Sequence, residues 1–163
     1  SDSGHRRAGG VTPDGNKSTL TFLGKRKMNM SKQENTVTIE MLAAFGDAWN
    51  RHDVDALMSF MTDDCVFETA AGPLACGTRH EGRNAVRIAF AQVWAVFPDA
   101  RWSSSHHWVC GDRGVSEWTF SGTRADGVRM EACGCDLFVF RDGKIAVKSA
   151  FRKDRPPVAA GQD

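Results

Sequence analysis

The sequence contains no tyrosine among its 163 residues, so no site in this chain can use a phenol hydroxyl. It has no run of 18 apolar residues, which argues against a membrane-spanning helix. The first residues lack the apolar core of a signal peptide, so we expect a cytoplasmic protein. Neither a phosphate-binding glycine loop nor a nucleophile elbow is present, and the histidines lack metal-ligand spacing. We therefore expect no cofactor, no metal and no membrane partner.

The net charge of +1 is unevenly distributed along the chain. Residues 1–35 carry seven basic and three acidic side chains, whereas residues 36–163 carry 14 basic and 17 acidic ones. The larger part is mildly acidic, which argues against nucleic acid as a partner. We interpret 1–35 as a disordered basic arm or a non-native leader, 36–153 as one domain and 154–163 as a loose tail.

The chain has few cysteines, and their number is odd. There are five, and Cys133-Gly134-Cys135 is too closely spaced for the C-x₂-C pattern of metal or redox sites. Free thiols in a reducing cytoplasm are the expected state.

Apolar spacing predicts three helices in the first half of the domain. The first begins near residue 36 and ends at 50–52. Asp53 is placed to cap a short second helix. A third starts near Arg83 or Asn84 and stops at Pro98. The predicted buried face of the first helix consists of Met41, Phe45, Ala48 and Trp49.

The rest of the domain reads as strands. One strand is predicted over 63–69, followed by a loop that contains His80. Four long antiparallel strands then follow, separated by Gly-Asp and Asp-Gly turns, over roughly 100–110, 113–123, 128–141 and 144–152. These elements predict an α+β fold, in which a curved, mixed and mainly antiparallel sheet wraps around the N-terminal helices as a cone and encloses a pocket.

Four segments carry a resemblance to a known family. They are AWNRHDVDALMSFMTDDCVFE, GRNAVRIAF, GDRGVSEWTFSGT and GCDLFVFRDGKIAVKSAFRK. The resemblance as a whole runs from Phe45 to Lys153. Their order and spacing resemble the family that contains nuclear transport factor 2, ketosteroid isomerase and the SnoaL-like polyketide cyclases. The family hosts enzymes, binding proteins and transport factors on one scaffold, so the resemblance predicts the fold more closely than the function.

Asp136 is the main catalytic candidate. The pattern Asp136, Phe138, Phe140 places one acid and two aromatic rings on the same face of a strand. By the resemblance, Asp136 matches the acid that stays protonated in ketosteroid isomerase and donates a hydrogen bond to an oxyanion. A structural aspartate, bonded to a buried backbone N–H, a tryptophan indole or an arginine, is the alternative reading.

Two departures from ketosteroid isomerase argue against true steroid isomerase activity. Its general base falls at Thr69, which cannot take a proton from carbon. Its oxyanion tyrosine falls at Phe45, and no tyrosine exists elsewhere in the chain to replace it.

Two adjacent histidines offer another acid–base group. His106 and His107 point to opposite faces of a strand, so only one of them is expected in the pocket, as a partner of Asp136. Glu68, beside the expected base position, is a weaker catalytic candidate. The expected ligand-binding residues are Phe45, Trp49, Thr69, His80, Trp94, Trp118, Phe120 and Phe138.

Three functions remain open at this point. The first is a cofactor-free enzyme that isomerises, cyclises, hydrates or dehydrates a small apolar carbonyl compound. The second is a non-catalytic protein that binds such a molecule in the same pocket. The third is a protein-interaction module. Leu137 and Val139, on the open face of the sheet, also predict a homodimer through that face.

Overall fold

The computed structural model describes residues 36–156, and the predicted arm at 1–35 and most of the predicted tail lie outside this range. The elements follow the predicted order, with one strand more than expected. They are α1 (Ile39–Asn50), α2 (Val54–Ser59), β1 (Met61–Glu68), β2 (Arg79–Glu81), α3 (Arg83–Val96), β3 (Arg101–Cys110), β4 (Arg113–Thr123), β5 (Arg129–Arg141) and β6 (Lys144–Arg152).

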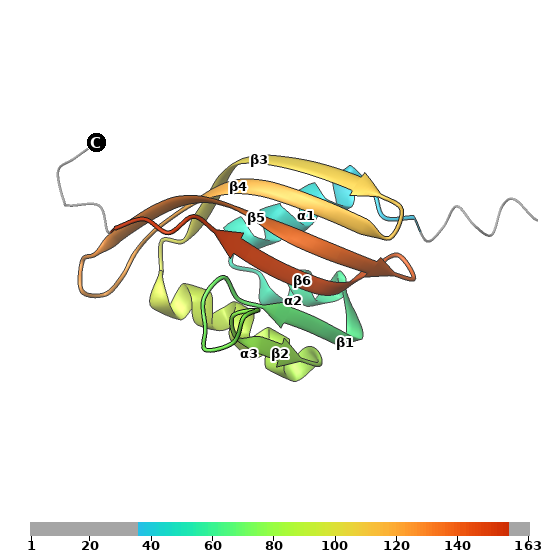
Figure 1. Cartoon of the computed structure of the whole chain (residues 1–163), viewed down its shortest axis with the longest axis horizontal. Coiled ribbons are helices and arrows are strands. Elements are labelled where there is room, and N and C mark those ends of the chain that lie inside the picture. Colours follow the sequence, from blue (N-terminus) through green and yellow to red (C-terminus); the bar gives the residue numbers. More distant parts are fainter. Residues whose placement is uncertain (1–35, 157–163) are drawn as a thin grey trace, which may run out of the picture. The chain divides into compact units, whose positions relative to one another are not determined.

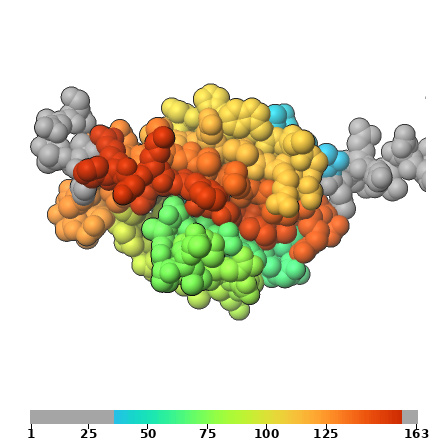
Figure 2. All heavy atoms as spheres, in the orientation of Figure 1, coloured from blue at the N-terminus to red at the C-terminus, as the bar shows by residue number. Residues whose placement is uncertain are grey.

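The six strands form one curved sheet in the order β2-β1-β6-β5-β4-β3 (Figure 1). Strands β1 and β6 are parallel, and every other neighbouring pair is antiparallel. The last strand therefore lies inside the sheet. In the space-filling view, the red atoms of β6 pass between the orange atoms of β5 and the green atoms around β1 and β2 (Figure 2). The α+β fold with a mainly antiparallel curved sheet confirms the prediction.

The helices begin where the sequence predicts. Thr38 caps α1 by accepting a hydrogen bond from Met41 N at 3.3 Å, and Asp53 caps α2 by accepting one from Ala56 N at 2.9 Å. Helix α3 starts at Arg83. The buried residues of α1 are Leu42, Phe45, Ala48 and Trp49, so Leu42 takes the place that the prediction gave to Met41.

One predicted loop is in fact a strand. Residues Arg79–Glu81 form β2, which pairs antiparallel with β1, and an ion pair between Arg79 and Glu68 (2.6 Å) ties the two strands together. The tripeptide Arg-His-Glu has no apolar alternation, so nothing in its sequence marks a strand.

The core lies between the helices and the concave face of the sheet. Its fully buried side chains include Leu42, Leu57, Met61, Phe90 and Phe138. Among the described helices, none combines the length and the apolarity that crossing a bilayer requires. Beside α3, the concave face of the sheet leaves a cavity, and this cavity is the candidate site.

Candidate functional site

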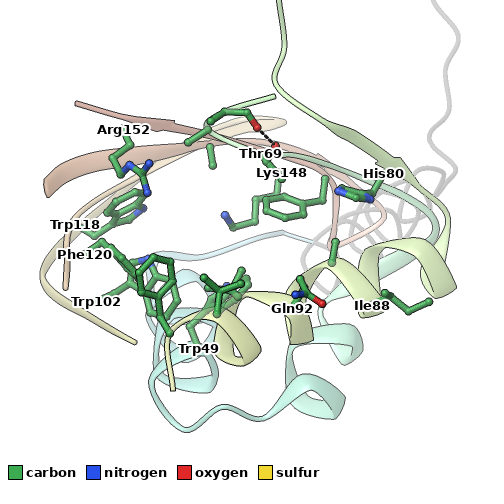
Figure 3. Close-up of a pocket in the computed structure, with 18 residues that line it drawn as sticks. Trp49, Thr69, His80, Ile88, Gln92, Trp102, Trp118, Phe120, Lys148 and Arg152 are labelled. Atoms are coloured by element: carbon green, nitrogen blue, oxygen red, sulfur yellow. Dashed lines mark hydrogen bonds between the residues drawn. The ribbon is translucent and has the colours of Figure 1, made fainter. Parts of the chain in front are cut away.

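A cavity of about 540 Å³ lies on the concave face of the sheet, beside α3 (Figure 3). Its aromatic lining residues are Trp49, Phe67, Phe97, Trp102, Trp118 and Phe120. Its polar lining residues are Thr69, His80, Gln92, Lys148 and Arg152. An apolar concavity with a few polar groups is the usual form of a small-molecule site.

Lys148 reaches into this cavity from β6, and its ammonium group is held by Asp136. The Nζ atom of Lys148 donates to Oδ1 of Asp136 at 2.6 Å, and the two side chains are only 6% and 9% exposed. The same nitrogen lies 4.9 Å from the ring centre of Phe67 and 5.5 Å from that of Trp49. Aromatic ring faces attract a cation at such distances. Lys148 lines the cavity, and Asp136 lies behind it.

A β-bulge turns Lys148 inward. Arg141 pairs with Lys144 and Phe140 with Ile145, but the register then shifts by one residue, so that Phe138 pairs with Lys148. Without this shift, Lys148 would lie opposite Leu137 on the outer face of the sheet, because a slip of one residue exchanges the two faces. The bulge therefore places the ammonium group of Lys148 on the cavity side of the sheet.

Trp118 completes the surroundings of Asp136. Its indole Nε1 donates to Oδ2 of Asp136 at 3.0 Å, so the two carboxylate oxygens have one donor each. The indole ring lies over Gly134 of the neighbouring strand, and a Cβ at Gly134 would come within 2.3 Å of Cη2 of Trp118. A larger residue at this position would displace the ring.

Three side chains stand in one row across the sheet. His80 on β2 pairs with Phe67 on β1, and Phe67 pairs with Lys148 on β6. The ring of His80 stacks on that of Phe67 with centroids 6.0 Å apart. Neighbouring strands are about 4.8 Å apart, so the Cα atoms of His80 and Lys148 are separated by roughly 10 Å. In Figure 3, both side chains extend into the cavity.

The structure separates the two adjacent histidines. His106 is exposed and stacks on Trp108, whereas His107 is half-buried and lines a small cavity of about 20 Å³ that Asp136 also borders. Nδ1 of His107 is 2.7 Å from Oγ of Ser116, which lies between it and Asp136 in the sheet. Burial, and secondly the charge of His106, lowers the pKa of His107.

Glu68 and Thr69 leave β1 in different directions. Glu68 is held by Arg79 at 2.6 Å and does not line the cavity. Thr69 does line it, but its hydroxyl donates to the carbonyl oxygen of Ala71 at 2.7 Å. Neither position presents a carboxylate to the cavity.

The remaining predicted ligand-binding residues divide into two groups. Trp49, Trp118 and Phe120 line the cavity. Phe45 and Phe138 are core residues that border only the small cavity. Trp94 lies outside both cavities, and its ring stacks on His52 with centroids 5.0 Å apart.

The lining residues that were not singled out from the sequence include Phe67, Trp102, Lys148 and Arg152. The signal for Lys148 lies in a different residue: a buried aspartate needs a donor, and a cation in the next strand can supply it. The two-residue turn at Asp142-Gly143 brings β5 and β6 together. The bulge in β6 decides on which face of the sheet the side chain of Lys148 lies.

Within residues 36–156, no three His, Cys, Asp or Glu side chains lie close enough together to hold a metal ion. The five cysteines, all described, are free thiols.

The SnoaL-like domain family matches residues 42–148, which is more than half of the chain, and the chain belongs to this family. A search of curated proteins finds no match.

Solved structures share the fold. A proposed polyketide cyclase from Xanthomonas campestris pv. campestris is 22% identical, with a TM-score of 0.61 over 69% of this chain and 87% of that one. An NTF2-like protein of unknown function from Mesorhizobium loti is 30% identical, with a TM-score of 0.59 over 71% and 89%. A protein from Catenulispora acidiphila with a ketosteroid isomerase-like fold, crystallised with trimethylamine, is 19% identical, with a TM-score of 0.62 over 71% and 86%.

Proposed function

We propose that the chain is a cofactor-free enzyme that carries out acid–base chemistry on a small apolar carbonyl compound. Isomerisation, cyclisation and hydration or dehydration of such compounds can all proceed through an enol or enolate. The single observation that carries the proposal is the row of His80, Phe67 and Lys148 in a cavity with a mainly apolar lining. A base and a cation on either side of an aromatic ring suit a flat substrate stacked near that ring.

Lys148 takes the role of oxyanion donor in this proposal. Its ammonium keeps two N–H donors after the bond to Asp136, and they can bind a carbonyl oxygen as it becomes negative. Asp136 acts as a positioning residue, because its carboxylate holds the ammonium group and does not line the cavity. Trp118 holds that carboxylate through its indole N–H and also lines the cavity. The reaction thus needs no protonated aspartic acid.

His80 takes the role of general base. A neutral imidazole nitrogen removes a proton from the carbon next to the carbonyl, and the C–H electron pair forms a carbon–carbon double bond. The carbonyl π electrons move to the oxygen beside Lys148. Return of the proton from His80 to the far carbon of a conjugated system completes an isomerisation, and all atoms are conserved.

The test is deuterium exchange at the methyl group of 2-acetonaphthone in D₂O, followed by proton NMR. Wild-type protein should accelerate exchange above buffer, and both His80→Gln and Lys148→Met should remove the acceleration. His106→Gln, outside the cavity, is the matched control and should keep it. Exchange at the buffer rate with wild-type protein would reject the enzymatic proposal. Circular dichroism establishes that each variant is folded.

A non-catalytic binding protein is the second candidate. Among the described lining residues of the cavity there is no Asp or Glu, so His80 is the one conventional base there. A saturable complex with 2-acetonaphthone, formed without exchange, would favour this candidate.

We also propose that a second copy of the chain covers the outer face of the sheet. Trp108, Leu137 and Phe151 are 51%, 43% and 51% exposed there, and Val115 lies between Trp108 and Leu137 in the same row. Exposed apolar patches of this kind mark interfaces. Sedimentation equilibrium should give a dimer for wild-type protein and a monomer for Leu137→Lys. If wild-type protein stays a monomer at high concentration, the proposed dimer through the outer face of the sheet is wrong.

A further inference from the structure

The cavity carries cations but no anions in its lining. Lys148 and Arg152 both contribute to it, and none of the described lining residues is Asp or Glu. We infer that the substrate is a flat aromatic carbonyl compound with one acidic group, whose carbonyl oxygen lies at Lys148 and whose anion lies at Arg152. The inference rests on the proposed function, because it names the substrate class for the same cavity.

Lys148 is unsuited to binding the anion. Asp136 already balances its charge at 2.6 Å, in a pair that is more than nine-tenths buried. A carboxylate brought to this pair would face the carboxylate of Asp136 within a few ångströms, and like charges repel strongly where water is excluded. A neutral carbonyl oxygen, in contrast, can accept from the two remaining N–H groups of Lys148 without adding a charge.

Arg152 is suited to binding the anionic group of the substrate. No residue within 36–156 forms an ion pair or a side-chain hydrogen bond with its guanidinium. The nearest acid along its neighbouring strand, Asp136, is already bonded to two other side chains. The next one, Glu131, is paired with Arg155 at 3.4 Å and Arg129 at 3.7 Å. A guanidinium presents paired N–H donors that match both oxygens of a carboxylate. One uncompensated positive charge therefore favours a monoanion.

The spacing of the two cations sets the shape of the substrate. Lys148, Ala150 and Arg152 alternate along β6, and all three line the cavity. Four residues of extended chain place the Cα atoms of Lys148 and Arg152 about 13 Å apart. In Figure 3, Arg152 lies beside Trp118 at one end of the cavity, His80 lies toward the other end, and Lys148 lies between them. A carbonyl group and an acidic group at opposite ends of fused rings fit this arrangement.

Aromatic walls favour flat rings between the two groups. Trp102 packs against Phe120 with centroids 5.2 Å apart and against Trp49 at 5.0 Å, which leaves broad ring faces along the cavity. A volume of about 540 Å³ falls within the range of small-molecule sites and admits a substituted bicyclic compound.

The experiment titrates intrinsic tryptophan fluorescence with two probes, 6-acetyl-2-naphthoate and 6-acetyl-2-naphthamide, which differ in charge and hardly in shape. Wild-type protein should bind the carboxylate at least tenfold more tightly than the carboxamide. Arg152→Gln should bring the two dissociation constants together. Lys153→Gln is the matched control, since it removes the same charge from the next residue, which does not line the cavity. The Lys153→Gln variant should still bind the carboxylate more tightly than the carboxamide.

Three results would overturn the inference. They are equal affinity of wild-type protein for the two probes, equal loss of preference in Arg152→Gln and Lys153→Gln, and no binding of either probe. Deuterium exchange of neutral 2-acetonaphthone is independent of this comparison. Exchange without a preference for the acid would leave the proposed function in place and reject the substrate class. A preference for the acid without exchange of either ketone would support the ligand class and reject the catalysis.

Discussion

Asp136 and Lys148 form a buried ion pair that joins strands β5 and β6 at the wall of the cavity. Replacing one partner leaves an uncompensated charge away from water, whereas replacing both removes the charge entirely. Lys148→Met should lower the free energy of unfolding by about 3 to 5 kcal/mol, and Lys148→Met combined with Asp136→Leu should lower it by less. Urea unfolding of the single and double variants measures the difference.

The exposed pair of Arg87 with Asp55, also at 2.6 Å, is the control for the buried pair. Arg87→Met should change the free energy of unfolding by no more than about 1 kcal/mol, because water screens the charges. Additive effects of the two substitutions at Asp136 and Lys148 would show that the buried charges act independently.

Gly134 should tolerate no side chain. A Cβ there would lie 2.3 Å from Cη2 of Trp118 and 2.4 Å from the carbonyl oxygen of Phe151, so the indole or the backbone must move. We expect Gly134→Ala to cost about 1 to 3 kcal/mol of stability and to change the near-ultraviolet circular dichroism of Trp118. Gly46→Ala, in α1, meets no atom within 4 Å and should be neutral or stabilising. Similar effects of the two substitutions would contradict the packing argument.

His107 should make stability depend on pH. Burial lowers its pKa in the folded protein, so the unfolded chain binds a proton on this side chain first as the pH falls. The free energy of unfolding that depends on neutral His107 is therefore fully present above about pH 6.5, the ordinary pKa of histidine. It is lost as the pH falls below this value. Urea unfolding between pH 5 and 7 should show a smaller slope in His107→Gln than in wild-type protein.

His106→Gln tests the cause of that slope. The charge of His106 is only the second contribution to the lowered pKa of His107, after burial. The variant should therefore keep most of the pH dependence. Loss of the whole slope in His106→Gln would mean that charge repulsion between the two histidines, and not burial, is responsible.

Asn50 should couple the end of α1 to the cavity wall. Its side-chain amide donates to the carbonyl oxygen of Trp102 at 2.9 Å and accepts from the backbone N–H of the same residue at 2.8 Å. Asn50→Ala leaves two backbone groups without these partners and should cost about 1 to 3 kcal/mol. Because Trp102 lines the cavity, the affinity for 6-acetyl-2-naphthoate should fall as well. Unchanged affinity in a destabilised variant would limit Asn50 to a structural role.

The fold could be predicted because local patterns agree with it. Apolar spacing gives α1 and α3, and turn residues such as Asp142-Gly143 give the hairpins, where both residues adopt positive φ. Strand alternation also places Asp136 and Phe138 on the inner face, and both are buried.

Lys148, one of the two partners of Asp136, could not be predicted in the same way. Regular pairing from the turn at Asp142-Gly143 places Lys148 outside, and one extra residue in β6 reverses this. Such a bulge depends on how the whole sheet curves, and no short sequence pattern reports it. The same limit applies to β2, the strand that carries His80: the sequence suggests His80 for the pocket but not the strand, which is held by its pairing with β1 and not by its own composition.

The parallel pairing of β1 and β6 has a consequence for biosynthesis. The strand made first among the six can enter the completed sheet only when the strand made last has been added between it and β5. A nascent chain that ends before Lys144 has helices, β1 and β2 on one side and a three-stranded meander on the other, with nothing to join them in a sheet. Contacts so distant in sequence form late and slowly. Formation of the cavity is therefore a late event, which requires synthesis of β6.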